Sequence, residues 1–273
     1  MKKSSVPVIL LAIAACFLTS CCKGKDNNAF AAQGDTLQTV YQVSTLQALV
    51  AGYYYPVCTV GELLKHGNFG IGTFEAIDGE MSIIDGVCYQ AKGDGSVVVV
   101  DTATCVPFAA VLPFVAEKQR EVKTIASLDS LRQLLDDEVK DVWGNLFVAC
   151  RIDGTFPKMH VRSELKQEKP YRKLAETLKT AQREFVYTEQ EGTVIALYCP
   201  EYAKDINSAG WHLHYISNDR TKSGHIIALE IEQAHISLDK VSNMSMHLPD
   251  DSLFNRLNLV GQEKDVRQVE QGR

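Results

Sequence analysis

Residues 78–100, DGEMSIIDGVCYQAKGDGSVVVV, decide which kind of fold the sequence predicts. Asp-Gly pairs at Asp78, Asp85 and Asp94 mark tight turns at short spacing. Between and after these turns lie MSII, VCYQA and SVVVV, whose apolar and β-branched residues favour strands. The stretch therefore predicts a meander of short antiparallel strands.

The segments around this meander alternate between strand-like and helix-like patterns. Apolar and β-branched runs predict strands at residues 69–74, 106–115, 145–152, 185–187, 193–199, 211–216 and 225–231. Capping residues and apolar periodicity predict helices at residues 44–50, from 59 onward, and at 127–135, 171–182 and 250–259. The run KMHVRSELKQEKP after Pro157 is polar, and we expect a connector there.

This order of elements predicts an α+β fold with two β-rich halves, built from mixed or antiparallel sheets, and a few peripheral helices. We expect an N-terminal β-rich domain over residues 36–165. Residues 166–273 are expected to form a C-terminal β domain that carries a metal site on a β-hairpin and ends in an active-site tail.

The composition is that of a globular protein and excludes one class of partner. The chain has 273 residues, of which 45% are hydrophobic, so it can bury a sizeable core. Its formal net charge is -6, and no basic run occurs in the sequence. Because phosphate contacts need clustered Lys and Arg, we expect no nucleic-acid partner.

The first residues have the pattern of an export signal. Lys2 and Lys3 precede an apolar segment over residues 6–18 that is short for a membrane span. LTSC, which ends at Cys21, resembles a bacterial lipobox, so residues 1–21 are interpreted as a lipoprotein signal peptide with Cys21 as the lipidation site. Residues 22–35 would form a flexible tether. We therefore expect an exported protein, lipid-anchored to the bacterial cell envelope on its periplasmic or outer-membrane face; an ordinary signal peptide is the alternative.

Three of the seven histidines form a pattern typical of a metal site. His212 and His214 are two residues apart, so in a strand they face the same side. If the following hairpin centres between Asp219 and Arg220, His214 and His225 lie directly opposite, with Cβ atoms about 5 Å apart. Three imidazoles on one face can bind a metal ion and leave its other positions open, as catalytic sites do.

The spacing of these histidines leaves two alternatives open. They could be separate surface or core histidines, and an HxH pair with a distant third histidine also occurs in unrelated metal enzymes. His235 shares the strand parity of His225 and is a rival ligand, although a structural role is the better interpretation.

Several runs of the sequence resemble acetolactate decarboxylases, in the same order and over nearly all of residues 36–273. These runs are YQVSTLQAL (41–49), HGNFGIGTF (66–74), IDGEM (77–81), RIDGTF (151–156), GWHLH (210–214) and GH (224–225). The sequence departs from the family pattern at Asn68, where a carboxylate is common, and in YYYPVC (53–58), which lacks an expected glycine. Neither departure affects a proposed ligand.

The resemblance implies a metal site and part of a catalytic pocket. His212, His214 and His225 would hold a divalent metal ion, usually zinc, although another divalent metal would also suit them. Glu80 would be a catalytic carboxylate, and Thr73 would line the substrate pocket.

The resemblance also implies an arginine, a carboxylate near the C-terminus and a homodimer. Arg162 would bind the substrate carboxylate and take part in catalysis, with Arg151 as its competitor. Glu270 would reach the site from the tail, with Glu263 as the second choice.

The reaction that the resemblance implies is the conversion of (S)-2-acetolactate to (R)-acetoin and carbon dioxide. The electrons left by carbon dioxide spread onto the neighbouring ketone oxygen as an enediolate, which a metal ion with open positions can chelate and stabilise. A carboxylic acid such as Glu80 or Glu270 can then protonate one face. An arginine suits the substrate carboxylate because its planar fork binds two oxygens.

Three other functions remain as alternatives. A cupin-like, metal-dependent oxygenase or isomerase would share the three histidines but would not explain the HGNFGIGTF and DGE runs. An inactive lipid-anchored binding protein would be marked by missing ligands, and none is missing. A purely structural envelope lipoprotein gives no reason for convergent histidines.

Overall fold

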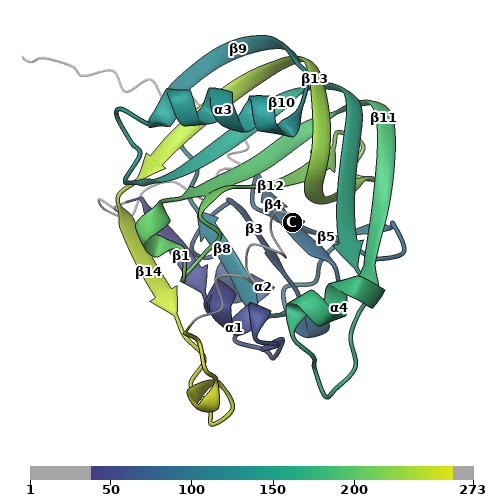
Figure 1. The fold of residues 1–273 in the computed structure, drawn as a ribbon, viewed down its shortest axis with the longest axis vertical. Helices are drawn as coiled ribbons and strands as arrows, with labels where there is room; N and C mark the ends of the chain where they lie inside the picture. The colour runs from purple at the N-terminus through teal and green to yellow at the C-terminus, as the bar shows by residue number, and fades with distance from the viewer. Residues whose placement is uncertain (1–37, 261–273) are drawn as a thin grey trace, which may run out of the picture. The chain divides into compact units, whose positions relative to one another are not determined.

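The computed structural model of the chain describes residues 38–260 and consists mainly of two β-sheets with a few helices (Figure 1). The predicted signal peptide, tether and Cys21, together with Glu263 and Glu270, lie outside the described residues. Among the described residues, no helix is long and apolar enough to cross a membrane.

The first sheet has seven strands in the order β14-β1-β8-β3-β4-β5-β6. All neighbours in it are antiparallel except β1 and β14, which run parallel. Its strands are β1 (Thr39–Val43), β3 (Phe69–Thr73), β4 (Glu80–Ile84), β5 (Val87–Ala91), β6 (Val97–Val99), β8 (Phe108–Leu112) and β14 (Asn243–His247).

The predicted meander is confirmed as β4, β5 and β6 of this sheet. Asp85 and Gly86 both have positive φ, 52° and 77°, as a two-residue turn between β4 and β5 requires. Gly79 and Gly95 also have positive φ, 84° and 88°, so each Asp-Gly pair lies at a turn. A separate two-stranded pair, β2 (Cys58–Thr59) and β7 (Cys105–Val106), packs against a hydrophobic cluster of the first sheet.

The second sheet has the order β10-β11-β12-β13-β9, and β10 also pairs with β13, so the sheet closes on itself. Three of its strands are very long. The strands are β9 (Lys118–Ile125), β10 (Phe147–Glu164), β11 (Gln182–Cys199), β12 (Gly210–Ser217) and β13 (Ser223–Val241).

The predicted polar connector after Pro157 is wrong, because β10 continues without interruption to Glu164. Lys158 is exposed, whereas Met159 and every residue from Val161 to Glu164 are buried. The segment is a strand because β11 and β13 pair with it on both sides, even though polar residues dominate its composition. Likewise, the predicted strands 185–187 and 193–199 are parts of the single strand β11.

Four predicted helices are confirmed. They are α1 (Leu46–Val50), α2 (Val60–Leu63), α3 (Leu128–Val139) and α4 (Leu174–Ala181). The hydroxyls of Thr45, Thr59 and Ser127 cap the first three by accepting backbone N–H bonds. Short 3₁₀ turns add η1 (Glu75–Ile77), η2 (Glu201–Ala203) and η3 (Phe254–Arg256).

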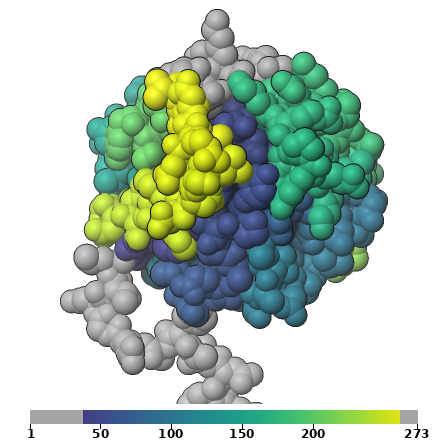
Figure 2. Space-filling model, turned by 90° about the horizontal axis from the view of Figure 1, so that it is seen from below, coloured from purple at the N-terminus to yellow at the C-terminus, as the bar shows by residue number. Residues whose placement is uncertain are grey.

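The helix predicted over residues 250–259 is wrong, since only η3 forms there. The Asp251 carboxylate accepts N–H bonds from Leu253 and Phe254 and the hydroxyl proton of Tyr53, which stabilises a turn. None of the η3 residues is buried, so no apolar face compensates for helix nucleation. Figure 2 shows this C-terminal segment, in yellow, against the purple N-terminal elements.

The two sheets are not consecutive along the chain. β9 and β10 precede residue 165 but belong to the second sheet, and β14 returns to the first. Between the sheets lies an apolar layer in which Phe69, Ile71 and Leu112 meet Ile195 and Ile216. A second core is formed where α3 packs on β9 and β13 (Figure 1). The sheets thus pack face to face, and the site lies between them.

Candidate functional site

The three predicted metal ligands lie together on the face of the second sheet that points toward the first sheet. His214 is the register partner of His225, as the hairpin argument predicts. His225 is in turn the register partner of Arg162 on β10. Because cross-strand partners project from the same face, His214, His225 and Arg162 form one row across β12, β13 and β10.

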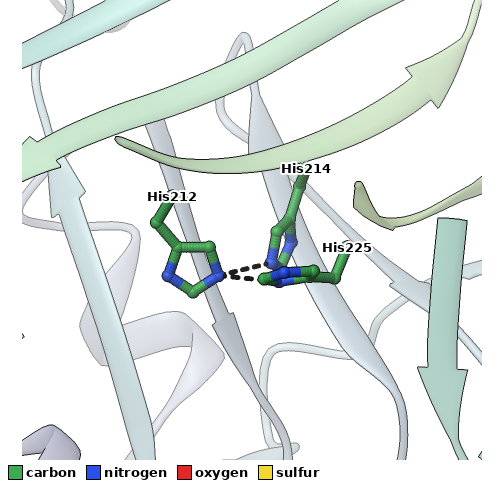
Figure 3. A group of neighbouring side chains, drawn as sticks. All are labelled: His212, His214 and His225. Carbon is green, nitrogen blue, oxygen red and sulfur yellow. Dashed lines mark hydrogen bonds between the residues drawn. The ribbon is translucent and has the colours of Figure 1, made fainter. Parts of the chain in front are cut away.

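The imidazole nitrogens of this cluster point toward one another (Figure 3). His212 Nε2 lies 3.0 Å from His225 Nδ1 and 3.2 Å from His214 Nε2. His214 Nδ1 lies 2.8 Å from the carbonyl oxygen of Met81 on β4. Only an N–H can donate to a carbonyl, so Nδ1 of His214 carries the proton and Nε2 presents a lone pair to the cluster.

This arrangement fits a metal ion. Two nitrogens that each lie ~2.1 Å from one ion are separated by roughly 3.0–3.4 Å for right-angled to tetrahedral geometry. The two separations that involve His212, 3.0 and 3.2 Å, match that range, and all three ligand nitrogens lie within 4.8 Å of one another. The bond from His214 to Met81 also supplies the outer contact that usually orients a metal-binding imidazole.

Burial keeps the three imidazoles neutral, which is the form that binds metal. Desolvation, followed by the charges of Arg162 and Arg132, lowers the pKa of His212 to about 3. Desolvation likewise holds the pKa of His214 and of His225 well below the usual range, with Arg162 and the neighbouring imidazoles adding to it. The cluster therefore remains uncharged at neutral pH.

Glu80 and Thr73 lie beside the histidines on the first sheet. They are register partners on β4 and β3, and both are buried. Glu80 Oε2 lies 3.4 Å from His214 Nε2, so this carboxylate faces the space where the imidazole nitrogens converge. The Thr73 hydroxyl donates to the carbonyl oxygen of Gly79, which ties β3 to the turn before Glu80.

The structure brings Arg162, and not Arg151, to the histidines. Arg162 is only 7% exposed, and Gly224 lets β13 approach it, because a Cβ on Gly224 would come within 2.6 Å of the Arg162 carbonyl oxygen. Arg151 lies near the other end of β10, where it binds Asp85 and Asp153 at 2.8 Å each.

A small cavity joins these residues between the two sheets. Its volume is about 40 Å³, whereas a single water molecule needs roughly 10–15 Å³ by the same measure. Its polar wall contains Thr73, Glu80, Arg162, Glu164, His212 and His225. Its apolar wall comes from α1, η1, β8 and α4 through Leu46, Leu49, Ile77, Phe108, Leu174 and Leu178.

Sequence reasoning missed Glu164 and the apolar wall. Glu164 is two residues beyond Arg162 and therefore faces the same side of β10. The spacing Arg-x-Glu could have indicated this, but only if residues 158–164 had been assigned to a strand. The apolar wall had no signal of its own, because leucines of amphipathic helices usually serve the core.

A second, larger cleft reaches the histidines from the side of α3. It has a volume of about 490 Å³ and borders His212, His225, Arg132 and Trp211. It exists because β12 and β13 pair only from His214↔His225 to Ile216↔Ser223 and diverge beyond that point. Two separate cavities therefore border the histidine cluster.

His235, the rival ligand, lies away from this site. Its Nδ1 is 2.8 Å from the Glu121 carboxylate on β9, and its side chain is 39% exposed. His66 stacks on Tyr41, and His160 faces Glu184. Within residues 38–260, His212, His214 and His225 form the group suited to a metal ion.

Comparison with known proteins gives this site a context. Residues 40–261 match the family described as alpha-acetolactate decarboxylase. The chain belongs to this family. The resemblance found in the sequence is thereby confirmed, and the family is one of carboxy-lyases.

Individual members of the family support the match over most of the chain. The alpha-acetolactate decarboxylase of Methanosarcina mazei is 39% identical over 85% of this chain and 80% of that protein. That of Lactococcus lactis subsp. lactis is 36% identical over 83% of this chain and 96% of that protein. The crystal structure of alpha-acetolactate decarboxylase from Bacillus subtilis strain 168 has a TM-score of 0.81 at 32% identity, covering 85% of this chain and 99% of that chain.

Proposed function

We propose that this protein is a zinc-dependent acetolactate decarboxylase that converts (S)-2-acetolactate to (R)-acetoin and carbon dioxide. The observation that carries the proposal is the row formed by His214, His225 and Arg162, with Glu80 opposite it. The row sets a cluster of neutral imidazoles beside a buried guanidinium, which suits a substrate that has both a metal-chelating hydroxy ketone and a carboxylate.

Arg162 binds the substrate carboxylate in this proposal. Its Nε is buried and has no hydrogen-bond partner among the described residues, and one terminal nitrogen donates a long 3.4 Å bond to Gln182. A guanidinium has five N–H donors in a planar fork, so donors remain for a bidentate carboxylate. A buried donor without a partner also costs about 1–3 kcal/mol, and a bound carboxylate would offset that cost.

His212, His214 and His225 would hold the divalent metal ion, which supplies Lewis-acid stabilisation of the charge that develops on the ketone oxygen. Arg162 orients the carboxylate so that the breaking carbon–carbon bond is aligned with the ketone π-system. Glu80, at the edge of the cluster, delivers a proton to the carbon that carbon dioxide leaves. Because Glu80 approaches from one side, one acetoin enantiomer is formed.

The apolar wall receives the methyl groups of the substrate. Leu174 and Leu178 of α4 border the cavity. They exclude water from the site while the charge moves, which strengthens the electrostatic interactions there.

The decisive experiment measures acetoin formed from racemic 2-acetolactate by the purified full chain. We expect acetoin to disappear after chelation and to return when zinc is added back. His214→Ala should abolish both zinc retention and acetoin formation, while His235→Ala should leave both unchanged. A folded, zinc-loaded protein that releases no acetoin would refute the proposal, and a requirement for oxygen or iron would favour a cupin-like enzyme.

The cellular location is a further part of this proposal. A lipid anchor at Cys21 is supported by the two N-terminal lysines, the apolar segment and the LTSC run. The enzyme would then act outside the inner membrane, on acetolactate that leaves the cell. Cys21→Ala should release the protein from the membrane fraction, and a wild-type protein found in the cytoplasm would contradict this part. The homodimer is supported by the resemblance to the family, and sedimentation of the purified protein tests it.

A further inference from the structure

Glu164 is the one carboxylate of the cavity that the proposed reaction leaves without a role. It is 2% exposed, and it lines the cavity together with Arg162. Glu164 Oε1 lies 3.9 Å from Arg162 Nε, within ion-pair distance but too far for a hydrogen bond. The two side chains project from the same face at the end of β10, so the backbone holds them near each other.

This loose pair matters because decarboxylation moves a negative charge away from Arg162. In the proposed reaction the bond between the carboxyl carbon and C2 breaks, and its electron pair passes to C2 and on to the ketone oxygen. Carbon dioxide leaves as a neutral molecule, and a proton then adds to C2. An arginine that only bound the substrate carboxylate would lose its counter-ion at this step and would remain as a buried, uncompensated cation.

A tight partner on Arg162 would also hinder catalysis. Interactions that stabilise the substrate more than the transition state raise the barrier, so Arg162 must hold the carboxylate without retaining it. A hydrogen-bonded glutamate would occupy the donors that the substrate needs. At 3.9 Å, Glu164 compensates the charge of Arg162 and leaves its Nε–H available.

We propose that Glu164 is the standing counter-ion of Arg162: it weakens the binding of the substrate carboxylate and balances the guanidinium charge as that carboxylate becomes carbon dioxide. Glu164 acts through Arg162 and is therefore a positioning residue. The proposal rests on the proposed decarboxylase function. It concerns the charge balance at the carboxylate end of the substrate and does not involve the metal ligands.

Glu164→Gln tests the proposal, because it removes the charge and keeps the shape. Binding is measured with 2,3-dihydroxy-2-methylbutanoate, which has the carboxylate but no ketone to accept electrons. We expect the Kd of this compound to fall about tenfold and kcat for acetolactate to fall about tenfold, each being the effect of a modest change in charge interaction. Binding and turnover thus change in opposite senses, which loss of structure does not produce.

Two further variants keep the result interpretable. Glu164→Asp retains the charge, so the Kd of the probe should stay near the wild-type value and kcat should recover in part. Glu121→Gln, on the exposed part of β9, should leave both unchanged. Unchanged Kd and kcat in a folded Glu164→Gln protein, or a Kd that rises, would overturn the proposal. Absence of acetoin from the wild-type protein would instead refute the decarboxylase function itself.

Discussion

The two ends of β10 each carry a partly or fully buried arginine, and the two arginines have different surroundings. Arg151 forms two ion pairs at 2.8 Å, with Asp85 and Asp153. Arg162 is more deeply buried, contacts Glu164 at 3.9 Å and Gln182 at 3.4 Å, and has a buried Nε without a hydrogen bond within the described chain.

This difference supports the proposed role of Arg162 in binding the substrate carboxylate and a structural role for Arg151. The donors of Arg151 are used by the protein, so Arg151 joins the β4–β5 turn to the second sheet. The donors of Arg162 are only partly used, and they face a cavity that also holds imidazoles and carboxylates. Incomplete hydrogen bonding of a buried charge is costly, and a bound carboxylate would offset that cost at Arg162.

The largest effect should come from removing each arginine in turn. Arg162→Gln is expected to lower kcat/KM for acetolactate by ~10²–10³-fold, because a desolvated charge contact to the substrate is lost. Arg151→Gln should change kcat/KM by less than about twofold, since its partners are carboxylates of the protein. Steady-state assays of acetoin formation on both variants check this. Equal losses of kcat/KM in the two variants would contradict the different roles of the two arginines.

A second test uses the pH dependence of stability in metal-free protein. The pKa of His212 is lowered to about 3 in the folded state, whereas an unfolded histidine titrates near 6.5, so below about pH 6.5 the unfolded chain binds more protons. The free energy of unfolding should therefore fall with acidification, by about 1.4 kcal/mol per pH unit for each such histidine. Urea unfolding in chelator between about pH 7 and about pH 5 measures it.

Two variants sharpen this pH test. Arg162→Gln should reduce the loss of stability, since Arg162 contributes to lowering the pKa of all three histidines, and Arg151→Gln should not. Burial raises the pKa of Asp239 to about 6, so this carboxyl contributes the opposite slope between about pH 4 and about pH 6. Asp239→Asn removes that contribution. A stability that rises with acidification in the Asp239→Asn protein would contradict neutral, buried imidazoles.

A smaller effect is expected on substrate selectivity when the apolar wall near Arg162 is trimmed. Leu178→Ala should raise kcat/KM for 2-aceto-2-hydroxybutyrate relative to acetolactate by roughly tenfold, the usual value for one methylene in an apolar pocket. Leu134→Ala on α3 is the matched control, because Leu134 packs on a different core. The ratio of the two kcat/KM values, measured in competition, decides it. A ratio that changes equally in both variants would argue against the α4 wall.

The smallest effect is expected on stability, at the end of β10 that carries Arg151. Arg151→Gln should lower the free energy of unfolding by about 1 kcal/mol, since its ion pairs are partly exposed. Asp85→Asn should cause a similar loss, and the double variant should lose less than the sum, because both changes remove one contact. Urea denaturation of the three proteins measures this coupling. Strict additivity would mean that Arg151 does not join β4–β5 to β10.

Local patterns were sufficient where neighbours in the sequence decide the structure. The Asp-Gly turns, the caps of α2 and α3, and the hairpin that pairs His214 with His225 were all predicted correctly. Each depends on contacts within a few residues, which turn and capping chemistry determine directly. The family was also readable from short motifs and is confirmed over residues 40–261.

Predictions were wrong or incomplete where distant strands decide the structure. Residues 158–164 are a strand because β11 and β13 flank them on both sides, and their polar composition concealed this. The segment 250–259 lacks the tertiary packing that a helix would need. Neither result follows from the local sequence, because both depend on which partners are available in space.

By itself, the sequence determined that the three histidines share one face of the sheet, since two of them lie in one strand and the third lies across a tight hairpin. Only the tertiary structure decided what lies beside that face. It places Arg162, and not Arg151, beside the histidines. It also brings Glu80 to them from the other sheet and buries Glu164 next to the guanidinium. The physical reason is that register between strands far apart in sequence is set by packing of the whole sheet, and no local pattern specifies it.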